Sequence, residues 1–192
     1  MAQDLTSPVP IYEVTADEAN RRRTLALSPC LQQRLQQRRL LPDMGFEFVD
    51  PGILKGDGFE LFRFSIMPPD ISRGTVPAYD FRIRINNQMV GQINLRVGLT
   101  EHIMLYAGNL GYKVDPPYRG RHLAARAINL LLPLARHHQM SELWICCNPE
   151  NWASRKTCER VGAELIEIIE VPPGIDLYER GDRATCRYRL RL

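Results

Sequence analysis

The chain has 192 residues, of which 44% are hydrophobic and 24% charged, and its formal net charge is +3. This composition is typical of a globular protein with one sizeable core, and the length leaves little room for a second domain. So small a net charge is weak evidence for any polyanionic partner.

Cysteine usage and hydropathy both favour a protein of a reducing compartment that does not cross a membrane. Five cysteines, at positions 30, 146, 147, 158 and 186, show no C-x-x-C spacing, which favours a reduced protein over a disulfide framework. The first ten residues lack the basic start and apolar core of a signal peptide. The most apolar stretch, residues 128–135, is too short to cross a bilayer. We therefore expect a cytoplasmic protein with no membrane partner.

The N-terminal part is predicted to be helical over residues 16–41. Pro29 would divide it into two helices, because an interior proline removes a helix hydrogen bond. Arginines recur in this part, at positions 21–23, 34, 38 and 39, and they offer an RNA-binding face as one interpretation. A solvated helix face is preferred, since no aromatic residues are interleaved for base stacking. Nucleic acid is accordingly not an expected partner.

Strands are predicted after a turn-rich connector at residues 45–58. Residues 59–67, 81–85 and 90–97 form an antiparallel meander, with a hairpin turn at Asn86-Asn87-Gln88. A central strand is expected over residues 105–114, ended by Asp115-Pro116-Pro117.

A helix over residues 119–138, kinked at Pro133, leads to a strand at 143–147. This strand–helix–strand unit should form a right-handed parallel crossover. A second helix over 151–161 ends at Gly162, and strands follow at 163–171 and 185–192. In the last strand, arginines at 187, 189 and 191 share one face. That face is predicted to be solvated, with an anionic-substrate wall as the alternative.

The turn that opens the first of these helices has the features of a phosphate site. It reads Arg119-Gly120-Arg121-His122-Leu123-Ala124, and the apolar periodicity of the helix starts inside it. The first N–H groups of a helix have no partner in the helix, and the positive end of its dipole lies behind them. Two arginines add charge beside them. This arrangement suits a phosphate group.

The residues YKVDPPYRGRHLA, at 112–124, resemble the acyl-coenzyme A signature of the GNAT acetyltransferase superfamily, Arg/Gln-x-x-Gly-x-Gly/Ala. Arg119 fits the first position and Ala124 the last, whereas His122 stands where the family usually has glycine. Residues 151–163 resemble the family's Asn-x-x-Ser helix, in the version nearest the ribosomal-protein N-terminal acetyltransferases.

The resemblance implies a mixed α/β fold (α+β): a mainly antiparallel twisted sheet of about six or seven strands, helices on both faces, and a central parallel strand pair that forms the cofactor cleft. It also implies one acetyltransferase-like domain over residues 1–192, with a divergent helical part at 1–57 and a core at 58–192.

The cofactor implied by the resemblance is acetyl-coenzyme A. The residues expected to bind it are Tyr112, Lys113, Val114, Arg119, Gly120, Arg121, His122, Leu123, Ala124, Asn151 and Ser154. For Asn151, an N-cap of the second helix is an equally good interpretation, and one residue can serve both roles. No metal-ligand spacing is present in the sequence.

The sequence does not match the family pattern at the positions of the general acid and the general base. The tyrosine that many members carry on the second helix is absent, and Asn109 occupies the region of their glutamate. Cys158 and Tyr106 are the candidate catalytic residues, although a buried packing role is preferred for Cys158.

The resemblance therefore implies an N-acetyltransferase, in which a primary amine attacks the thioester directly in a ternary complex. The acceptor would be a protein N-terminus or a small-molecule amine, and a homodimer stays open beside a monomer. The alternative is a non-catalytic acyl-coenzyme A-binding sensor or scaffold module.

Overall fold

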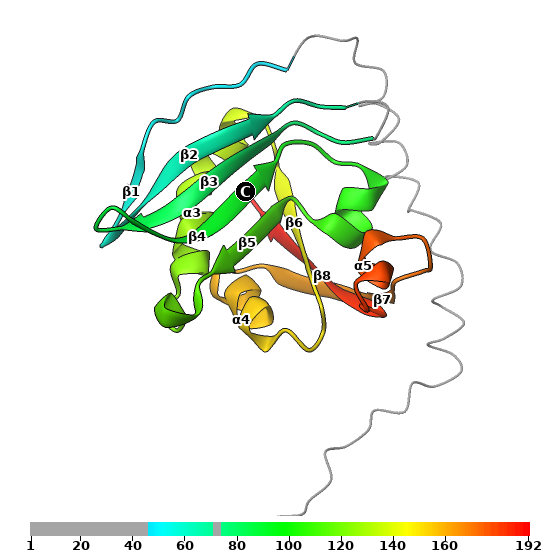
Figure 1. The fold of residues 1–192 in the computed structure, drawn as a ribbon. Coiled ribbons are helices and arrows are strands. Elements are labelled where there is room, and N and C mark those ends of the chain that lie inside the picture. The colour runs from blue at the N-terminus through cyan, green and yellow to red at the C-terminus, as the bar shows by residue number, and fades with distance from the viewer. Residues whose placement is uncertain (1–45, 71–73) are drawn as a thin grey trace, which may run out of the picture. The chain divides into compact units, whose positions relative to one another are not determined.

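A computed structural model describes residues 46–70 and 74–192 (Figure 1). Five antiparallel strands form one sheet in chain order: β1 (Leu54–Gly56), β2 (Phe59–Met67), β3 (Ala78–Ile85), β4 (Gln88–Arg96) and β5 (Leu110–Val114). A second sheet has the order β6 (Glu142–Cys147), β8 (Ala184–Arg191), β7 (Glu164–Glu170). The helices are η3 (Ile103–Ala107), η4 (Pro116–Tyr118), α3 (Leu123–His137), α4 (Trp152–Arg160) and α5 (Asp176–Glu179).

The predicted fold class, mixed α/β with mainly antiparallel strands, is confirmed. The structure adds β1, which lies in the stretch predicted to be a connector. The helices predicted at residues 16–41 and their arginine face lie outside the described residues.

The meander folds as its sequence pattern predicts. β2 has the predicted bounds, and the inward side chains of β3 and β4, such as Phe81, Ile83 and Ile93, are fully buried. Asn86 and Asn87 connect β3 to β4 with φ values of 47° and 65°. Positive φ at both central residues is what a type I′ hairpin turn requires, and asparagine tolerates it better than most residues.

The prediction of a strand from residue 105 is wrong. Residues Ile103–Ala107 form the π-helix η3, and the strand begins only at Leu110. The stretch is short and apolar, and over such a length periodicity does not separate a strand from a helical turn; in η3 the buried residues are the neighbours Ile103 and Met104. Gly108, with φ of 67°, makes the turn from η3 into the strand.

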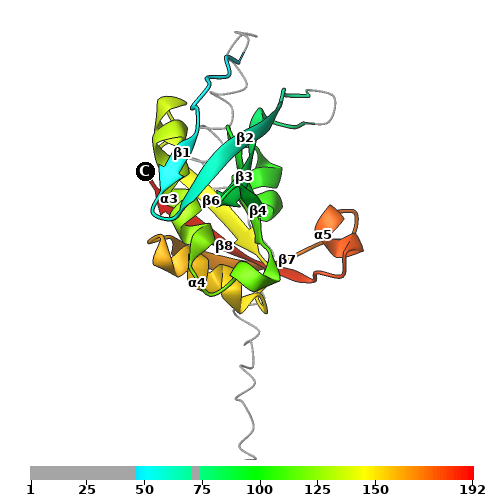
Figure 2. The same ribbon diagram turned by 60° about the vertical axis from the view of Figure 1, so that its left-hand side comes forward.

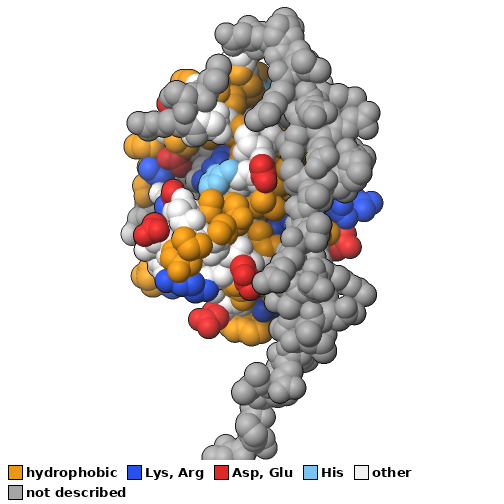
Figure 3. All heavy atoms as spheres, turned by 90° about the vertical axis from the view of Figure 1, so that its right-hand side faces the viewer, with side chains coloured by type: hydrophobic (Ala, Val, Ile, Leu, Met, Phe, Trp, Pro, Cys, Tyr) orange, Lys and Arg blue, Asp and Glu red, His pale blue; other side chains and the backbone are white. Residues whose placement is uncertain are grey.

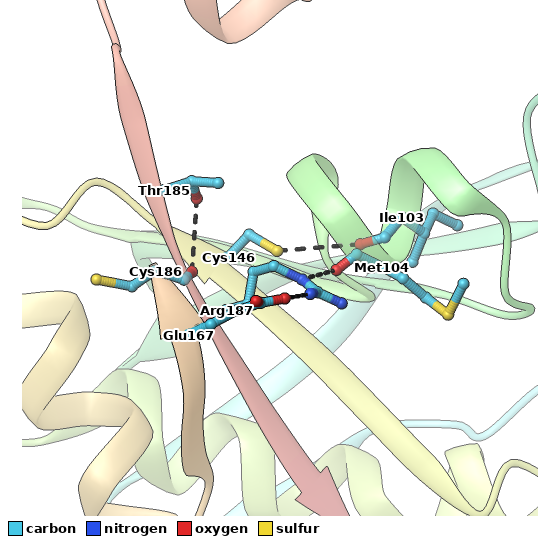
Figure 4. A network of polar contacts seen from close by, with 7 residues as sticks. All are labelled: Ile103, Met104, Cys146, Glu167, Thr185, Cys186 and Arg187. Atoms are coloured by element: carbon cyan, nitrogen blue, oxygen red, sulfur yellow. Dashed lines mark hydrogen bonds and ion pairs between the residues drawn. The ribbon is translucent and has the colours of Figure 1, made fainter. Parts of the chain in front are cut away.

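The prediction of a solvated arginine face on β8 is wrong for Arg187, which is only 4% exposed. Its Nε donates to the carbonyl of Met104 in η3 at 2.7 Å, and its Nη1 pairs with Glu167 of β7 (Figure 4). Its guanidinium also lies 4.6 Å from the ring centroid of Trp144. Arg187 thus ties the second sheet to η3, whereas Arg191 is exposed.

Helix α3 covers one face of the five-stranded sheet, and η3 lies on the other side (Figure 2). The buried residues of α3 join those of β2, β3 and β4 in one core; they include Leu123, Ala127, Ile128 and Leu131. As predicted, α3 does not end at Pro133 but continues to His137. η3 and α5 lie on one face of the molecule, where hydrophobic side chains gather among scattered charged ones (Figure 3).

The crossover through α3 brings β6 beside the start of β5, with both strands running in the same general direction (Figure 1). No ladder joins the two strands, however, since they belong to different sheets. They meet at one point, where the N–H of Asn109 donates to the carbonyl of Trp144 at 2.6 Å. The two strands predicted to form a central parallel pair, β5 and β6, are therefore hydrogen-bonded only beside the start of β5 and diverge beyond it.

Asn109 holds the point where the sheets meet, and it is fully buried. Its Oδ1 accepts from the N–H of Trp144 on β6 at 2.8 Å. Its Nδ2 donates to the carbonyls of Arg96 at 3.0 Å and Gly98 at 2.8 Å, at the end of β4. One side chain therefore satisfies backbone groups of both sheets, which would otherwise be buried without partners.

Gly108 lets the two sheets approach at this point. A Cβ on this residue would lie 2.9 Å from the nitrogen of Cys146 and 2.9 Å from the oxygen of Trp144. Those are backbone atoms of β6 that cannot rotate away, so any larger residue would push the sheets apart.

Substitution of Asn109 by alanine should destabilise the protein by about 3 kcal/mol, because buried backbone groups of both sheets lose their partner. Urea unfolding followed by tryptophan fluorescence measures this change. Gln92→Ala is the control, because Gln92 is an exposed amide on β4 and its loss should change the free energy of unfolding by no more than about 0.5 kcal/mol. Equal effects of the two substitutions would contradict the role given to Asn109.

Candidate functional site

A cavity of about 500 Å³ opens where β5 ends, between the start of α3 and α4. Two of the elements that line it, the end of β5 and helix α4, are labelled in the lower half of Figure 1. Its lining residues are Tyr112, Lys113, Val114, Tyr118, Arg119, Gly120, His122, Leu123, Ala124, Ala125, Asn151, Ala153, Ser154, Lys156, Thr157 and Arg160.

One wall of the cavity is the N-terminus of α3. No side chain caps this helix, so the N–H groups of its first residues are left for another partner. Gly120 has a φ of 79° and His122 a φ of 56°, and these two left-handed residues turn the chain into the helix. Arg119 is held in place by its Nε, which donates to the carbonyl of Val114 at 3.0 Å.

The charge of the cavity is strongly one-sided. Lys113, Arg119, Lys156 and Arg160 line it together with His122, and none of the aspartates and glutamates in residues 46–70 and 74–192 does. Within the described residues none of these four cations forms an ion pair. Four unpaired cations beside an uncapped helix N-terminus make a site for a ligand with several negative charges.

The inner wall is polar and built from β5 and α4. The hydroxyl of Tyr112 lies 2.8 Å from the Oγ of Ser154 and 3.9 Å from the sulfur of Cys158. Burial raises the pKa of Tyr112, so its hydroxyl is protonated at neutral pH. Asn151 accepts from the N–H of Ser154 at 3.0 Å, which confirms its predicted role as the N-cap of α4.

The two candidate catalytic residues do not line the cavity. Cys158 is fully buried behind Tyr112, and a hydrogen bond with Cys147, together with burial, raises its pKa. Tyr106 lies in η3, on the other side of the point where the sheets meet, and burial raises its pKa as well. Both groups are protonated at neutral pH.

Most of the predicted cofactor-binding residues come together in the cavity. Arg121 is the exception: its guanidinium lies 5.5 Å from the ring centroid of Tyr118, and it is not among the lining residues. The sequence pattern did not predict that one face of α4 lines the cavity, with Ala153, Lys156, Thr157 and Arg160 at spacings of three and four. Residues at that spacing lie on one face of a helix, so the two cations at 156 and 160 could have indicated this wall.

Comparisons with known proteins agree with this geometry. The model of the GNAT acetyltransferase domain matches residues 63–164. None of the curated proteins compared with the chain matches it. GNAT domains use acetyl-coenzyme A, so the predicted cofactor is the cofactor of the matched family.

Two solved structures with TM-scores above 0.5 share the fold, and a third aligns with a lower TM-score. RimL, a ribosomal L7/L12 alpha-N-protein acetyltransferase in complex with coenzyme A, is 15% identical with a TM-score of 0.54, over 73% of this chain and 98% of its own. A ribosomal-protein-S5-alanine acetyltransferase from Vibrio fischeri is 11% identical with a TM-score of 0.54, over 72% and 96%. The microcin C7 self immunity acetyltransferase MccE aligns over 60% of this chain, which spans 61% of that chain, with 18% identity and a TM-score of 0.45. The predicted resemblance to the GNAT superfamily is confirmed by the family model. The ribosomal-protein acetyltransferases named above share the fold.

Among the helices that the structure describes, none is long and apolar enough to cross a membrane.

His122 generates a prediction of its own, because it adopts a left-handed conformation that costs a residue with a Cβ about 1 kcal/mol. His122→Gly should raise the free energy of unfolding by about 1 kcal/mol and tighten the binding of a phosphate ligand, since the Cβ beside the helix N-terminus is removed. Denaturant unfolding and calorimetric titration measure the two effects.

Gln139, just beyond α3, provides the matched control, because its φ is also 56°. Gln139→Gly should give a similar gain in stability and leave ligand affinity unchanged. A loss of affinity in His122→Gly would contradict the proposed approach of ligand to the backbone.

Proposed function

Because the chain belongs to the GNAT acetyltransferase family, we propose that its cavity binds acetyl-coenzyme A and that the chain transfers the acetyl group to a primary amine. The observation that carries this proposal is the cavity itself, which has four cations, an uncapped helix N-terminus and no carboxylate from the described part of the chain. The bound thioester would supply an activated acetyl group. The protein would hold it in line with the amine in a ternary complex.

The phosphate groups would lie at the turn before α3. The N–H groups of Leu123 and Ala124 are without helix partners, and Gly120 keeps the approach to them open. Arg119, fixed on the carbonyl of Val114, adds a cation beside them. Lys156 and Arg160 face the same space from α4 and would bind the remaining phosphate oxygens.

The pantetheine arm would lie along the open edge of β5. The N–H of Asp115 donates to Val90 on β4, and the N–H of Gly111 donates to the side chain of Asn94 on the same strand. Because backbone direction alternates along a strand, the N–H groups of Tyr112 and Val114 point to the opposite edge. That edge has no ladder to β6, so these groups are free for the amides of the arm.

The Tyr112–Ser154 pair is the best-placed proton donor for the departing thiolate. Both residues line the cavity, their hydroxyls are hydrogen-bonded at 2.8 Å, and this bond favours the phenolate that Tyr112 becomes when it gives up its proton. The sequence-based assignments of Cys158 and Tyr106 stay predictions. Cys158 lies 3.9 Å from the Tyr112 hydroxyl and would act only through it.

The acceptor would be a protein N-terminus or a small-molecule amine. The segment at residues 172–182, which carries α5, and the loop at 68–77, part of which lies outside the described residues, would form its side of the site. We extend the proposal to one acetyltransferase domain with its core at residues 58–192.

A second candidate function is a binding module without turnover. In the region that matches residue 109, some family members carry a glutamate that acts as the general base. Here the position is taken by Asn109, a fully buried amide that bonds to backbone groups and cannot act as a base, which favours binding without turnover. Release of free thiol from acetyl-coenzyme A in the presence of a panel of primary amines separates the two functions, because a module binds without releasing thiol.

Calorimetric titration should show saturable binding of acetyl-coenzyme A that weakens about tenfold in Lys156→Ala and in Arg160→Ala, since each loses one charged contact to phosphate. Arg136→Ala is the control, because Arg136 is an exposed arginine in the last turn of α3, away from the cavity, and its affinity should match that of the wild type. Acetyl-pantetheine, which lacks the nucleotide phosphates, should bind far more weakly. Absence of saturable binding to the wild type would remove the proposal.

Ser154→Ala should lower kcat about 100-fold with a much smaller change in KM for acetyl-coenzyme A, because a proton donor acts mainly in the transition state. The matched control is Thr157→Val, since the Thr157 hydroxyl also lies on the cavity wall but donates back to the carbonyl of Ala153 at 2.9 Å. Thiol release with the best amine of the panel measures both. A kcat unchanged by Ser154→Ala would exclude this residue as the donor.

A further inference from the structure

Three thiols meet on the α4 side of the second sheet. Cys147, at the end of β6, is paired in register with Cys186 on β8, and Cys158 approaches from α4. Cys158 and Cys186 are fully buried, whereas Cys147 is partly exposed. Cys158 and Cys186 belong to one buried core, and Cys147 packs against it.

The groups around Cys147 favour its thiolate. The hydrogen bond from Cys158 is the largest influence, followed in the same direction by a hydrogen bond from Ser154, the charge of Arg155 and a hydrogen bond from Cys186. Partial burial opposes them, yet the pKa of Cys147 is lowered to about 7. Tyr112 and Tyr188 complete the surroundings as protonated phenols.

Cys146, the preceding residue, is the natural contrast. It points to the other face of the sheet, where its sulfur lies 4.0 Å from the carbonyl of Ile103 in η3, while Cys186 points away from that side (Figure 4). Burial raises the pKa of Cys146 to about 12. Two adjacent cysteines of one strand therefore lie in opposite environments, one reactive and one inert.

We propose that Cys147 is a site of reversible oxidation, at which a peroxide first forms a sulfenic acid and Cys186 then closes a disulfide. The proposal rests on the cluster of thiols and on the register of the ladder, and it does not depend on the acetyl donor or acceptor.

The chemistry balances with one peroxide. The Cys147 thiolate attacks one peroxide oxygen, the O–O bond breaks, and hydroxide leaves and takes up a proton as water. The Cys186 sulfur then attacks the sulfenic sulfur. The S–S bond forms, the S–O bond breaks, and the hydroxyl leaves as water with the thiol proton. Two thiols have lost two electrons, and the peroxide has been reduced to two waters.

The ladder places the two cysteines at the separation that a disulfide needs. Directly opposed residues of antiparallel strands have Cα atoms about 4.5 to 5.5 Å apart. Disulfides span about 4.4 to 6.8 Å between Cα atoms, so the bond closes without a large movement of backbone. This register is the reason to assign the disulfide to Cys186.

Oxidation would reach the cavity through Ser154. Its hydroxyl helps to lower the pKa of Cys147, is hydrogen-bonded to Tyr112 at 2.8 Å, and lines the cavity. A disulfide at Cys147 removes the thiolate that Ser154 favours, so the polar wall of the cavity would be rearranged. A reversible loss of acetyl transfer is the expected consequence.

The first test is differential alkylation of the folded chain with iodoacetamide at pH 7, followed by peptide mass spectrometry. Cys147 should be labelled about 100-fold or more faster than Cys146, since only its thiolate is populated at this pH. Equal rates at the two positions would overturn the proposal.

The second test is treatment with hydrogen peroxide and non-reducing peptide mapping. The wild type and Cys146→Ala should both yield a Cys147–Cys186 disulfide that dithiothreitol reverses, and Cys147→Ala should yield none. In Cys186→Ala the sulfenic acid should persist and react with dimedone. Circular dichroism checks the fold of this variant; if it does not fold, dimedone trapping in the wild type at early times provides the same information.

A disulfide in Cys147→Ala, or oxidation of the wild type at Cys146 in preference to Cys147, would contradict the proposal. So would a wild-type disulfide that joins Cys147 to Cys158. These readouts are chemical and need no turnover, so they stand or fall separately from the acetyltransferase assay.

Discussion

Everything that positions the site depends on how two sheets are joined at a single point. Asn109 satisfies backbone groups of β4 and β6 with one side chain, and Gly108 allows the close approach that those hydrogen bonds need. Beyond this point no ladder continues between β5 and β6. The sheets therefore diverge, and β5 keeps one edge of N–H groups without a partner. Backbone N–H groups on an open sheet edge can pair with an extended ligand, and this is how the proposed pantetheine arm would use the edge of β5.

Helix α4 connects the chemistry of this opening to the thiol cluster behind it. Ser154 takes part in both, since it lines the cavity, hydrogen-bonds to Tyr112 and helps to lower the pKa of Cys147. The cations of α4 face the cavity, and Cys158 on its buried side faces the sheet. A short amphipathic helix thus presents charge to the cofactor space and sulfur to the core. Acetyl transfer and oxidation would both involve this wall of the cavity, so oxidation of the thiol cluster would change the rate of acetyl transfer.

Where the sequence pattern was unambiguous, it predicted the fold. Strict alternation located β3, and Asn86-Asn87 located the hairpin, because few residues tolerate positive φ there. The turn at 119–124 and the cap at Asn151 were recognisable because both depend on local chemistry. Contacts between residues distant in the sequence could not be recognised in this way. The burial of Arg187 depends on η3, Glu167 and Trp144, which come together only in the folded chain, and η3 itself was mistaken for a strand.

The most direct test of the central claim is a crystal structure of the chain with coenzyme A. We expect diphosphate oxygens about 3 Å from the N–H groups of Leu123 and Ala124, and pantetheine amides paired with the backbone of Tyr112 and Val114 along the open edge of β5. A coenzyme A bound elsewhere, with the edge of β5 closed by protein side chains, would contradict it.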